Sequence, residues 1–383
     1  MSRVLDGVLV LDLTRHLPGP YATQLLADLG ARVIKLEAPE GDPVRFVPPH
    51  DAAGVSAAFR ALNQGKRGLG LDLKRPEAVE LVRRLAARAD VLVEGFRPGV
   101  MARLGLDPDQ LRREHPRLVV CSISGYGQDG PYRDRPGHDL DYQAYAGALW
   151  VTADPDGRAV LPGIQLGDLS AALSAVVGIL AGLFQRERSG QGRKVDAAML
   201  DALVSLQALH LAPHRAGQRA VPGQLPLSGG IPSYGLYRCA DGKWVALGAL
   251  EPKFFQAMCA IVGKPEWAER QFDRTLADDL AALFATRPRD EWRFILEDAG
   301  CCLAPVLDYD EVAEDPQVVA RGLLPPGRVA PPVRFDPPYG PAQAVFPARI
   351  GEHTREVLAQ ELGLGAGEID RLVEAGVAIA PPP

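Results

Sequence analysis

Three ionisable residues stand where a predicted helix begins, and their types suit acid–base or nucleophilic chemistry. His138 opens a helical run after a Pro-Gly pair, Asp168 follows a glycine at the start of an apolar helix, and Glu251 precedes a helix-starting proline. A helix start offers unpaired N–H groups and the positive end of the dipole, which stabilise a carboxylate. The same position suits a plain capping acid, and a lone histidine is more often structural. Position alone leaves both roles open.

A second group of candidate residues is basic and follows predicted strands in the N-terminal half. Its members are Lys66, Arg67, Lys74, Arg97 and Arg103. In an open α/β sheet, ligands bind outside the carboxyl ends of the strands. Basic side chains there suit phosphate and pyrophosphate groups, although most lysines and arginines are only solvated surface residues. No glycine-rich dinucleotide fingerprint and no P-loop occurs, so we do not expect a dinucleotide or nucleoside triphosphate site.

The first 200 residues alternate short apolar runs with segments of helical periodicity. Strands are predicted at Val8–Leu13, Arg32–Leu36, Gly68–Leu73, Val91–Glu94 and Leu118–Ser124. Helices are predicted at Pro20–Leu29, Pro76–Ala89, Pro108–Glu114, Asp139–Trp150 and Leu169–Phe184. This alternation predicts a parallel sheet with helices on both faces, a doubly wound α/β domain.

After about residue 205 the pattern changes to that of a smaller α+β domain. A stretch rich in Gly, Pro and Ser precedes a β-hairpin, Tyr234–Arg238 and Lys243–Leu247, around an Asp-Gly turn. Helical segments follow at Pro252–Val262, Leu276–Ala285 and Arg289–Asp298. A second Pro-rich stretch then leads to two helical patterns between Glu352 and Ala375.

Composition and charge are those of an ordinary globular chain, long enough at 383 residues for two cores. A net charge of −6 argues against nucleic-acid binding, because phosphate contacts need a basic excess. The N-terminus lacks a secretory signal, and the most apolar stretch, about 16 residues from Leu169 to Phe184, is shorter than the ~20 that span a membrane. The five cysteines lack metal-ligand spacing. We therefore expect reduced thiols, no metal, no membrane partner and a cytoplasmic protein.

Around these residues the chain resembles the superfamily of family III coenzyme A-transferases and α-methylacyl-CoA racemases over nearly its whole length. The blocks that carry the resemblance stand in the family's order. They read VLVLDLTRHLPGPYATQLLADLGARVIKLEAPEGDPVR, LNQGKRGLGLDLKRPEAVELVRRLAARADVLVEGFRPGVMARLGL, SISGYGQDGPYRDRPGHDLDYQAYAG, LGDLSAALSAVVGILAGL, GRKVDAAMLDA, LAPVLDYDEVAEDPQVVARGLL and IGEHTREVLAQELG. So many ordered blocks are highly specific for the superfamily and much less specific for the reaction.

The resemblance implies a Rossmann-like large domain built from both chain ends, with a small α+β domain inserted between them. On this plan residues 1–205 and 326–383 form the large domain and residues 206–325 the small domain with its linkers. Two chains are implied to interlock as a homodimer, with the active site between the large domain of one and the small domain of the other. The second block implies coenzyme A contacts at Leu73, Lys74, Gly95, Phe96, Arg97 and Arg103. No other cofactor is implied.

Two reactions compete within the superfamily, and both use Asp168. In the transferases the equivalent aspartate attacks the acyl-CoA carbonyl, and coenzyme A then passes between carboxylates through a mixed anhydride and an enzyme-bound thioester. In the racemases it works with a histidine in a Gly-His-Asp block and a glutamate before proline, which His138 and Glu251 match. Two bases then move the α-proton, and Glu251 orients or tunes the imidazole. The full set favours racemase or epimerase chemistry, with coenzyme A transfer as the alternative and a non-catalytic acyl-CoA-binding protein as a minor one.

Four positions bear on that choice. Leu17 stands where transferases such as formyl-CoA transferase carry a glutamine, which also favours the racemase. Asp141 and Gln143 depart from the Asn and apolar residue typical of racemases after the Gly-His-Asp block. Ala38 replaces an arginine that many members hold near coenzyme A. These departures leave the reaction open between the two chemistries.

Overall fold

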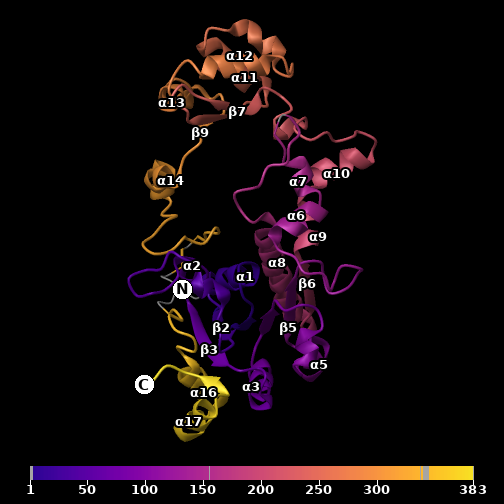
Figure 1. Ribbon diagram of the computed structural model, residues 1–383, viewed down its shortest axis with the longest axis vertical. Helices are drawn as coiled ribbons and strands as arrows, with labels where there is room; N and C mark the ends of the chain where they lie inside the picture. Colours follow the sequence, from indigo (N-terminus) through magenta and orange to yellow (C-terminus); the bar gives the residue numbers. More distant parts are fainter. Residues whose placement is uncertain (1–2, 155, 337, 340–344, 383) are drawn as a thin grey trace. The chain divides into compact units, whose positions relative to one another are not determined.

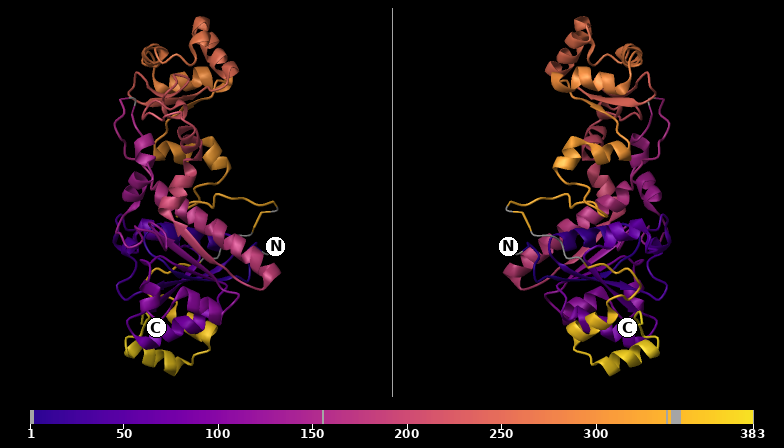
Figure 2. Two further views of the ribbon diagram at one scale, coloured as in Figure 1. Left: turned by 90° about the vertical axis from the view of Figure 1, so that its right-hand side faces the viewer. Right: turned by 90° about the vertical axis from the view of Figure 1, so that its left-hand side faces the viewer.

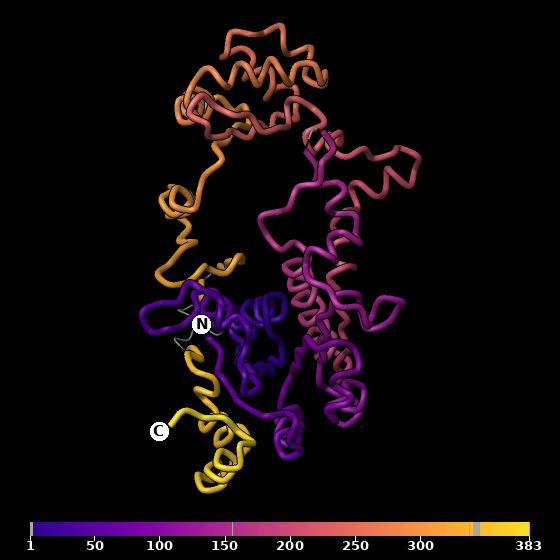
Figure 3. The backbone as a smooth tube through the Cα atoms, viewed as in Figure 1, coloured from indigo at the N-terminus to yellow at the C-terminus, as the bar shows by residue number. Residues whose placement is uncertain are grey.

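The computed structural model describes residues 3–154, 156–336, 338–339 and 345–382. It divides the chain into two compact units, each described here by itself. Unit 1 comprises Met1–Tyr145, Gln165–Ser205 and Leu323–Pro383, and unit 2 comprises Ala146–Ile164 and Leu206–Gly322. Unit 1 thus contains both chain ends, which Figure 3 shows as the indigo and yellow parts of the tube. Within the expected return segment 326–383, residues 337, 340–344 and 383 lie outside the described part.

Unit 1 is built on a seven-stranded sheet in the order β10-β3-β2-β1-β4-β5-β6. Its strands are β1 Leu9–Leu13, β2 Arg32–Glu37, β3 Lys66–Leu71, β4 Val91–Glu94, β5 Val119–Ser124, β6 Lys194–Ala198 and β10 Ala378–Ile379. All neighbours are parallel except β10, which pairs antiparallel with β3. The order of the first six strands is that of the doubly wound nucleotide-binding fold, whose strand order reverses between β1 and β4. Ligands of such sheets bind at that point, beyond the carboxyl ends of the strands.

Successive side chains of a strand point to opposite faces of the sheet, and β1 and β5 are buried along their whole length. Both faces are therefore buried, and helices cover both. On one face Leu9, Leu11 and Leu13 join a core with α3 (Pro76–Ala86) and the C-terminal helices. These are α16 (Thr354–Leu362) and α17 (Ala366–Glu374), which lie beside β3 and α3 in Figure 1. On the other face α1 (Pro18–Asp28) packs against α8 (Leu166–Ser189), which also contacts β5 and β6. Figure 2 shows α8 and the C-terminal helices on opposite sides of the sheet.

Helix α8 is longer than the apolar run predicted from the sequence. It has 24 residues, and by length and composition alone it could cross a membrane. About half of its most apolar window is buried in unit 1, where alanines and glycines allow close packing on the sheet. Leu173, Val177 and Phe184 remain exposed. The prediction that this helix is buried is therefore correct for one face of α8. The prediction that it is too short to span a membrane is wrong, because α8 has 24 residues.

Unit 2 contains a three-stranded antiparallel sheet, β7 (Tyr234–Arg238), β8 (Trp244–Gly248) and β9 (Leu303–Pro305). The helices α11 (Pro252–Ile261), α12 (Leu276–Phe284) and α13 (Arg289–Leu296) pack on it around buried aromatic side chains. Together the two units confirm a mixed α/β fold with a large, mainly parallel sheet and a small antiparallel one. The hairpin and these three helices stand within two residues of their predicted ends.

The remaining elements are short and connect the larger ones. They are η1 Pro43–Phe46, α2 Ala57–Asn63, α4 Val100–Arg103, α5 Pro108–Glu114, α6 Asp139–Tyr145, α7 Ala148–Val151, α9 Met199–Leu206, α10 Ala208–Arg215, η2 Pro226–Ser228, η3 Pro265–Arg270, η4 Glu297–Ala299, α14 Tyr309–Glu314 and α15 Pro316–Ala320. The single helix predicted over Asp139–Trp150 is divided into α6 and α7 by Gly147, whose φ of 78° is left-handed. The predicted strand Gly68–Leu73 begins two residues earlier, at Lys66.

Candidate active site

A cavity of about 580 Å³ opens in unit 1 where β1, β4 and β5 end. Its walls come from the segments that follow these strands and from the starts of α6 and α8. The lining residues are Thr14, Arg15, His16, Pro18, Gly19, Gly95, Phe96, Arg97, Pro98, Ile123, Ser124, Gly125, Tyr126, Arg133, Arg135, Pro136, Gly137, His138, Asp139, Asp141, Tyr142, Asp168 and Met199. The cavity therefore occupies the place where a sheet of this strand order binds ligands.

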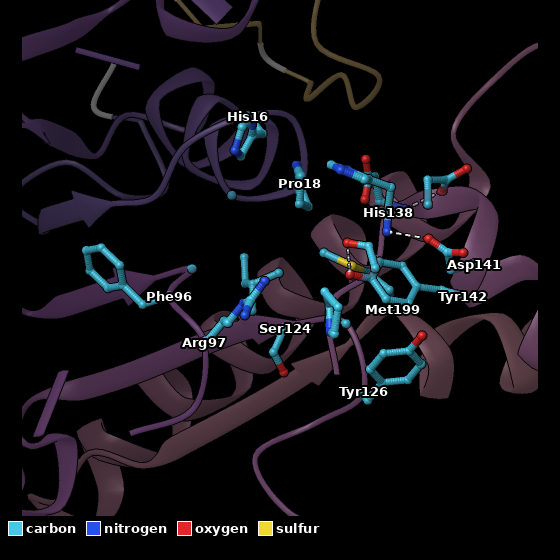
Figure 4. A pocket seen from close by; sticks show the side chains of 18 of the residues that line it. His16, Pro18, Phe96, Arg97, Ser124, Tyr126, His138, Asp141, Tyr142 and Met199 are labelled. Atoms are coloured by element: carbon cyan, nitrogen blue, oxygen red, sulfur yellow. Dashed lines mark hydrogen bonds between the residues drawn. The ribbon is translucent and has the colours of Figure 1, made fainter. Parts of the chain in front are cut away.

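The loop after β1 forms one wall of this cavity and is tightly constrained. A Cβ atom at Gly19 would lie 2.2 Å from the Cβ of Thr14, so only glycine allows α1 to begin this close to the loop. His16 has a φ of 67°, a left-handed conformation that is rare for a residue other than glycine. In Figure 4, His16 and His138 lie on either side of Pro18. The loop thus places an imidazole at the cavity wall at the expense of backbone strain.

A cluster of four buried charges lies beneath the loop: Asp12, Lys35, Asp42 and Lys66, here termed the buried charge network. Lys66 Nζ lies 3.1 Å from Asp12 Oδ2, and Lys35 Nζ lies 2.9 Å from Asp42 Oδ2. Lys35 also donates to the carbonyl of Thr14 at 3.0 Å. Burial alone raises the pKa of Asp12, but the two lysines and two threonine hydroxyls outweigh it and lower that pKa to about 2. The paired charges hold the backbone from which the cavity wall extends.

His138 lies immediately before α6, and its backbone is fixed by the residues that follow it. Asp141 Oδ2 accepts the His138 N–H at 2.9 Å, and the Tyr142 hydroxyl donates to the Gly137 carbonyl at 2.6 Å. Asp141 therefore has a definite role, because its carboxylate satisfies an N–H that the helix start leaves free. The imidazole of His138 remains exposed to the cavity.

Asp139 joins the starts of α6 and α8. Its Oδ1 accepts the backbone N–H groups of Gly167 and Asp168 at 2.7 and 3.0 Å, and its Oδ2 accepts from Gln143. Asp139 thus occupies the free N–H groups at the start of α8, and Gln143 holds Asp139 in place. The side chains of Asp141 and Gln143, which depart from the racemase pattern, both support the His138–Asp139 turn.

Asp168 is the third residue of α8, and its carboxylate does not cap the helix. The residue at the N-cap position is Gln165, and no side chain of the helix's own start makes a cap hydrogen bond. Burial, together with the nearby Asp139, raises the pKa of Asp168 to about 6, while His138 acts in the opposite direction. The carboxyl group is therefore poised to gain and lose a proton near neutral pH.

A smaller cavity of about 200 Å³ adjoins the first and shares Thr14, Arg15 and Phe96 with it. Leu73, Lys74 and Ala38 line it as well. Lys74 is 82% exposed and lies 3.6 Å from Glu40, so its ammonium group is free to turn toward a ligand. The two cavities together offer a continuous surface, with cations at the smaller one and the Asp168–His138 pair at the larger one.

The other predicted site residues are placed differently. Gly95, Phe96 and Arg97 line the larger cavity, whereas Arg103 lies on α4 and does not line either cavity. Its guanidinium lies near Gly99, beside the loop that carries Arg97. Glu251 belongs to unit 2, where it is the N-cap residue of α11 without a side-chain cap hydrogen bond. Its relation to His138 stays a prediction.

Several residues at the cavity escaped the sequence-based prediction. Arg15, His16 and Arg133 line it, and Arg133 lies near Gly99 on the same side as Arg103. Asp139 organises the two helix starts. Arg15 and His16 could have been predicted, because they closely follow a buried strand and ligands bind at strand ends. No periodicity or spacing marks Arg133.

Comparison with known proteins assigns the family. The model of CoA-transferase family III matches residues 5–343. The chain belongs to this family. Mouse succinyl-CoA:glutarate CoA-transferase is 33% identical over 393 residues, covering 97% of this chain and 90% of the relative. Human α-methylacyl-CoA racemase is 34% identical over 389 residues, covering 97% and 98%.

A solved structure agrees with this family III assignment. A CAIB/BAIF family protein from Brucella suis superposes with a TM-score of 0.83 at 31% identity, covering 94% of this chain and all of that one. The curated relatives are enzymes of the family III type, and so is this chain. Transferases and a racemase match it at nearly equal identity, so the similarity does not separate the two reactions.

Proposed function

We propose that this family III enzyme acts on acyl-CoA thioesters as a racemase or epimerase, exchanging the proton on the carbon next to the thioester. The observation that carries the proposal is the pair in the larger cavity. Asp168 has a carboxyl group with a pKa of about 6 and no capping role, and His138 lies close enough to influence it. A carboxylate and an imidazole in one cavity can each remove and return a proton as general base and general acid.

In this reaction one group removes the α-proton and the other returns a proton to the opposite face. The thioester carbonyl carries negative charge as the enolate forms and needs hydrogen-bond donors directed at it. The backbone N–H groups at the start of α8 are taken by Asp139, so other donors must serve. Glu251 is proposed to orient or tune the imidazole of His138, supplied from unit 2 of the partner in an interlocked homodimer.

Coenzyme A is proposed to bind across the smaller cavity and its border with the larger one. Leu73 and Phe96 line the smaller cavity, and Lys74 and Arg97 offer cations to the phosphates. Gly95 leaves room for close approach, and Arg103 acts from the rim near Gly99. We propose no further cofactor and no metal. The proposed location of the protein is the cytoplasm.

Coenzyme A transfer is the second candidate, because mouse succinyl-CoA:glutarate CoA-transferase matches the chain as well as the racemase does. In that reaction the Asp168 carboxylate attacks the thioester carbonyl, which expels coenzyme A as the thiolate and leaves a mixed anhydride. The thiolate then attacks the aspartyl carbonyl of the anhydride, which releases the first carboxylate and forms the enzyme-bound thioester. A carboxyl group with a pKa of about 6 is mostly ionised at neutral pH, so Asp168 suits this role as well as that of a base. The presence of His138 beside it in the cavity is what favours the racemase. A purely binding protein is disfavoured by membership in an enzyme family.

Deuterium incorporation separates these functions. In D₂O a racemase labels the α-carbon of a 2-methylacyl-CoA without any second substrate, whereas a transferase needs an acceptor carboxylate and forms an enzyme thioester sensitive to hydroxylamine. We expect both enantiomers to gain deuterium at the α-carbon. Carboxylate-dependent coenzyme A transfer without any exchange across a panel of acyl-CoAs would establish the transferase instead.

The proposed assembly has its own test. Interlocked rings cannot separate without unfolding, so two differently tagged dimers purified separately should form no heterodimer when mixed. Subunit exchange under native conditions, or a monomer in sedimentation, would contradict this arrangement.

A further inference from the structure

The enolate of the proposed reaction needs a hydrogen-bond donor at the thioester oxygen, and several donors of the larger cavity already have protein acceptors. Three backbone N–H groups at the helix starts are bonded to carboxylates, and one tyrosine and one arginine of the wall are bonded as well. These donors and their acceptors are the N–H groups of Gly167 and Asp168 (Asp139), the N–H of His138 (Asp141), the Tyr142 hydroxyl (Gly137) and the Arg135 guanidinium (Tyr145). The loop after β1 lies on another side of the cavity and keeps a donor free.

That donor is the imidazole of His16, which lines the cavity and is exposed. Within the described residues, neither nitrogen of its ring has a hydrogen-bond partner. The backbone of His16 is bonded through its N–H to Asp42 Oδ1 at 3.2 Å. Figure 4 shows the His16 ring on the other side of Pro18 from His138. The ring therefore remains available to a ligand in the cavity.

The surroundings of His16 fix the position of this donor. Its left-handed φ of 67° persists because Asp42 holds its N–H, while Lys35 donates to Asp42 at 2.9 Å and to the carbonyl of Thr14 at 3.0 Å. Strained backbone of this kind survives only where its surroundings determine it, and it gathers at functional sites. A donor that is held in place before the reaction stabilises developing charge without first being ordered.

The charge state of the ring suits a donor that keeps its proton. Burial lowers the pKa of His16, and Arg15, His138 and Lys35 act in the same direction, against Asp42. The imidazole is therefore neutral at neutral pH and carries one N–H. A neutral imidazole can polarise a carbonyl oxygen in an enzyme that moves a proton on the neighbouring carbon.

We propose that His16 is a catalytic residue, whose imidazole N–H donates to the thioester oxygen as negative charge develops on it. Asp168 and His138 line the same cavity and move the α-proton, while His16 keeps its own. His138 is near enough to both residues to influence the pKa of each. This inference rests on the proposed acyl-CoA chemistry and names the group that stabilises its enolate.

Acetoacetyl-CoA tests the donor separately from racemisation, because its enolate is stable and absorbs in the near ultraviolet. Absorbance at saturating enzyme measures the ratio of enolate to keto form in the bound ligand at a fixed pH. We expect wild type to hold more enolate than free acetoacetyl-CoA does. His16→Leu should lower the bound ratio at least ~10-fold, and His16→Gln should keep most of it through its amide N–H.

A second variant covers the strained backbone. Glycine adopts a left-handed φ without strain, so His16→Gly removes the donor and leaves the loop its conformation, and it should lose as much enolate as His16→Leu. His115→Gln is the control, because His115 ends α5 before β5, whereas the cavity lies beyond the other end of that strand. It should match the wild type.

Steady-state kinetics should show the same pattern in α-proton exchange. A donor that acts in the transition state contributes to kcat, so His16→Gly should lower kcat by ~10²–10³-fold and change KM by less than about 3-fold. His16→Gln should recover at least ~10-fold of the lost rate. A variant whose KM rises while its kcat stays at the wild-type value would show that His16 only binds substrate, which would overturn the inference.

Two further results would overturn it. One is an unchanged enolate ratio in both His16→Leu and His16→Gly. The other is a loss of enolate in Arg15→Gln with none in His16→Gly, which would assign the donor to Arg15, a residue that also lines the smaller cavity. If His16 stabilises the bound enolate but the wild type labels no 2-methylacyl-CoA in D₂O, the racemase proposal fails and this inference stands.

Discussion

The buried charge network and the cavity above it use the same kinds of residues in opposite ways. Below the loop after β1, Asp12 and Lys66 are fully buried and paired, and each has several hydrogen-bond partners. Above it, Asp168 and His138 face the cavity and their side chains are not tied into caps. Paired charges fix the backbone, and free charges remain for a ligand. The separation of these tasks lets the cavity tolerate a strained residue such as His16.

Breaking a pair in the buried charge network is expected to have the largest effect on stability. Asp12→Asn leaves Lys66 buried without its partner carboxylate, which should lower the free energy of unfolding by about 3–5 kcal/mol. Urea unfolding followed by circular dichroism measures this. The exposed ion pair Arg117–Glu187 supplies the control variant Arg117→Ala. A loss below about 1 kcal/mol for Asp12→Asn would show that the network does not hold the loop.

A free cation of the cavity should instead affect binding. Arg97→Ala removes a charge-assisted hydrogen bond to coenzyme A, and we expect acyl-CoA affinity to fall by ~1.5–3 kcal/mol with a smaller change in kcat. Isothermal titration together with steady-state kinetics checks both quantities. Lys74→Ala and Arg103→Ala should weaken binding in the same direction. If all three variants bind acyl-CoA with unchanged affinity, this surface does not bind coenzyme A.

The raised pKa of Asp168 predicts a pH dependence of stability. The folded state holds the proton up to a pKa of about 6, whereas the unfolded chain loses it near ~3.9, so the wild type loses stability as pH rises between these values. Asp168→Asn lacks this loss. Allowing for partial exposure, the variant should be more stable than the wild type by about 1–2 kcal/mol at pH 8 and by much less at pH 4. An equal difference at both pH values would contradict the raised pKa.

The smallest effect is expected for the exposed pair Lys74–Glu40, whose side chains are 82% and 68% exposed. Glu40→Gln should change the free energy of unfolding by less than about 0.5 kcal/mol, because solvent screens such pairs. Thermal unfolding of Glu40→Gln and Asp12→Asn, measured under the same conditions, compares the two losses of stability directly. A larger loss would mean that surface charges near the smaller cavity also support the fold.

Much of the architecture was predictable because it depends on local patterns. Compact apolar runs marked β1, β4 and β5, and helical spacing marked α3 and α5, since burial on both faces of a parallel sheet leaves a clear signature. The strand β6 was missed because Lys194–Ala198 is short and carries two charged residues. The return of β10 beside β3 joins residues about 300 positions apart, and spacing along the chain carries no information on such a pairing.

The candidate site was predictable only in part, for a related reason. Asp168 and His138 were visible as residue types at helix starts. The residue that holds their two helices together was not predictable, because Asp139 accepts hydrogen bonds from N–H groups of a helix 28 residues further along the chain. The buried charge network likewise joins lysines of β2 and β3 to Asp12 of β1 and to Asp42, through contacts that only the folded sheet creates.

Alpha-proton exchange by matched variants tests the central claim that Asp168 and His138 form a proton-transferring pair. Each enantiomer of a 2-methylacyl-CoA is incubated in D₂O with wild type, Asp168→Asn, His138→Ala and the control His115→Gln. We expect the wild type and His115→Gln to label and interconvert both enantiomers, and each of the other two variants to lose interconversion by at least ~10²-fold while still binding substrate. If His138→Ala interconverts the enantiomers at the wild-type rate, or if the wild type labels neither while transferring coenzyme A to a carboxylate, the claim is wrong.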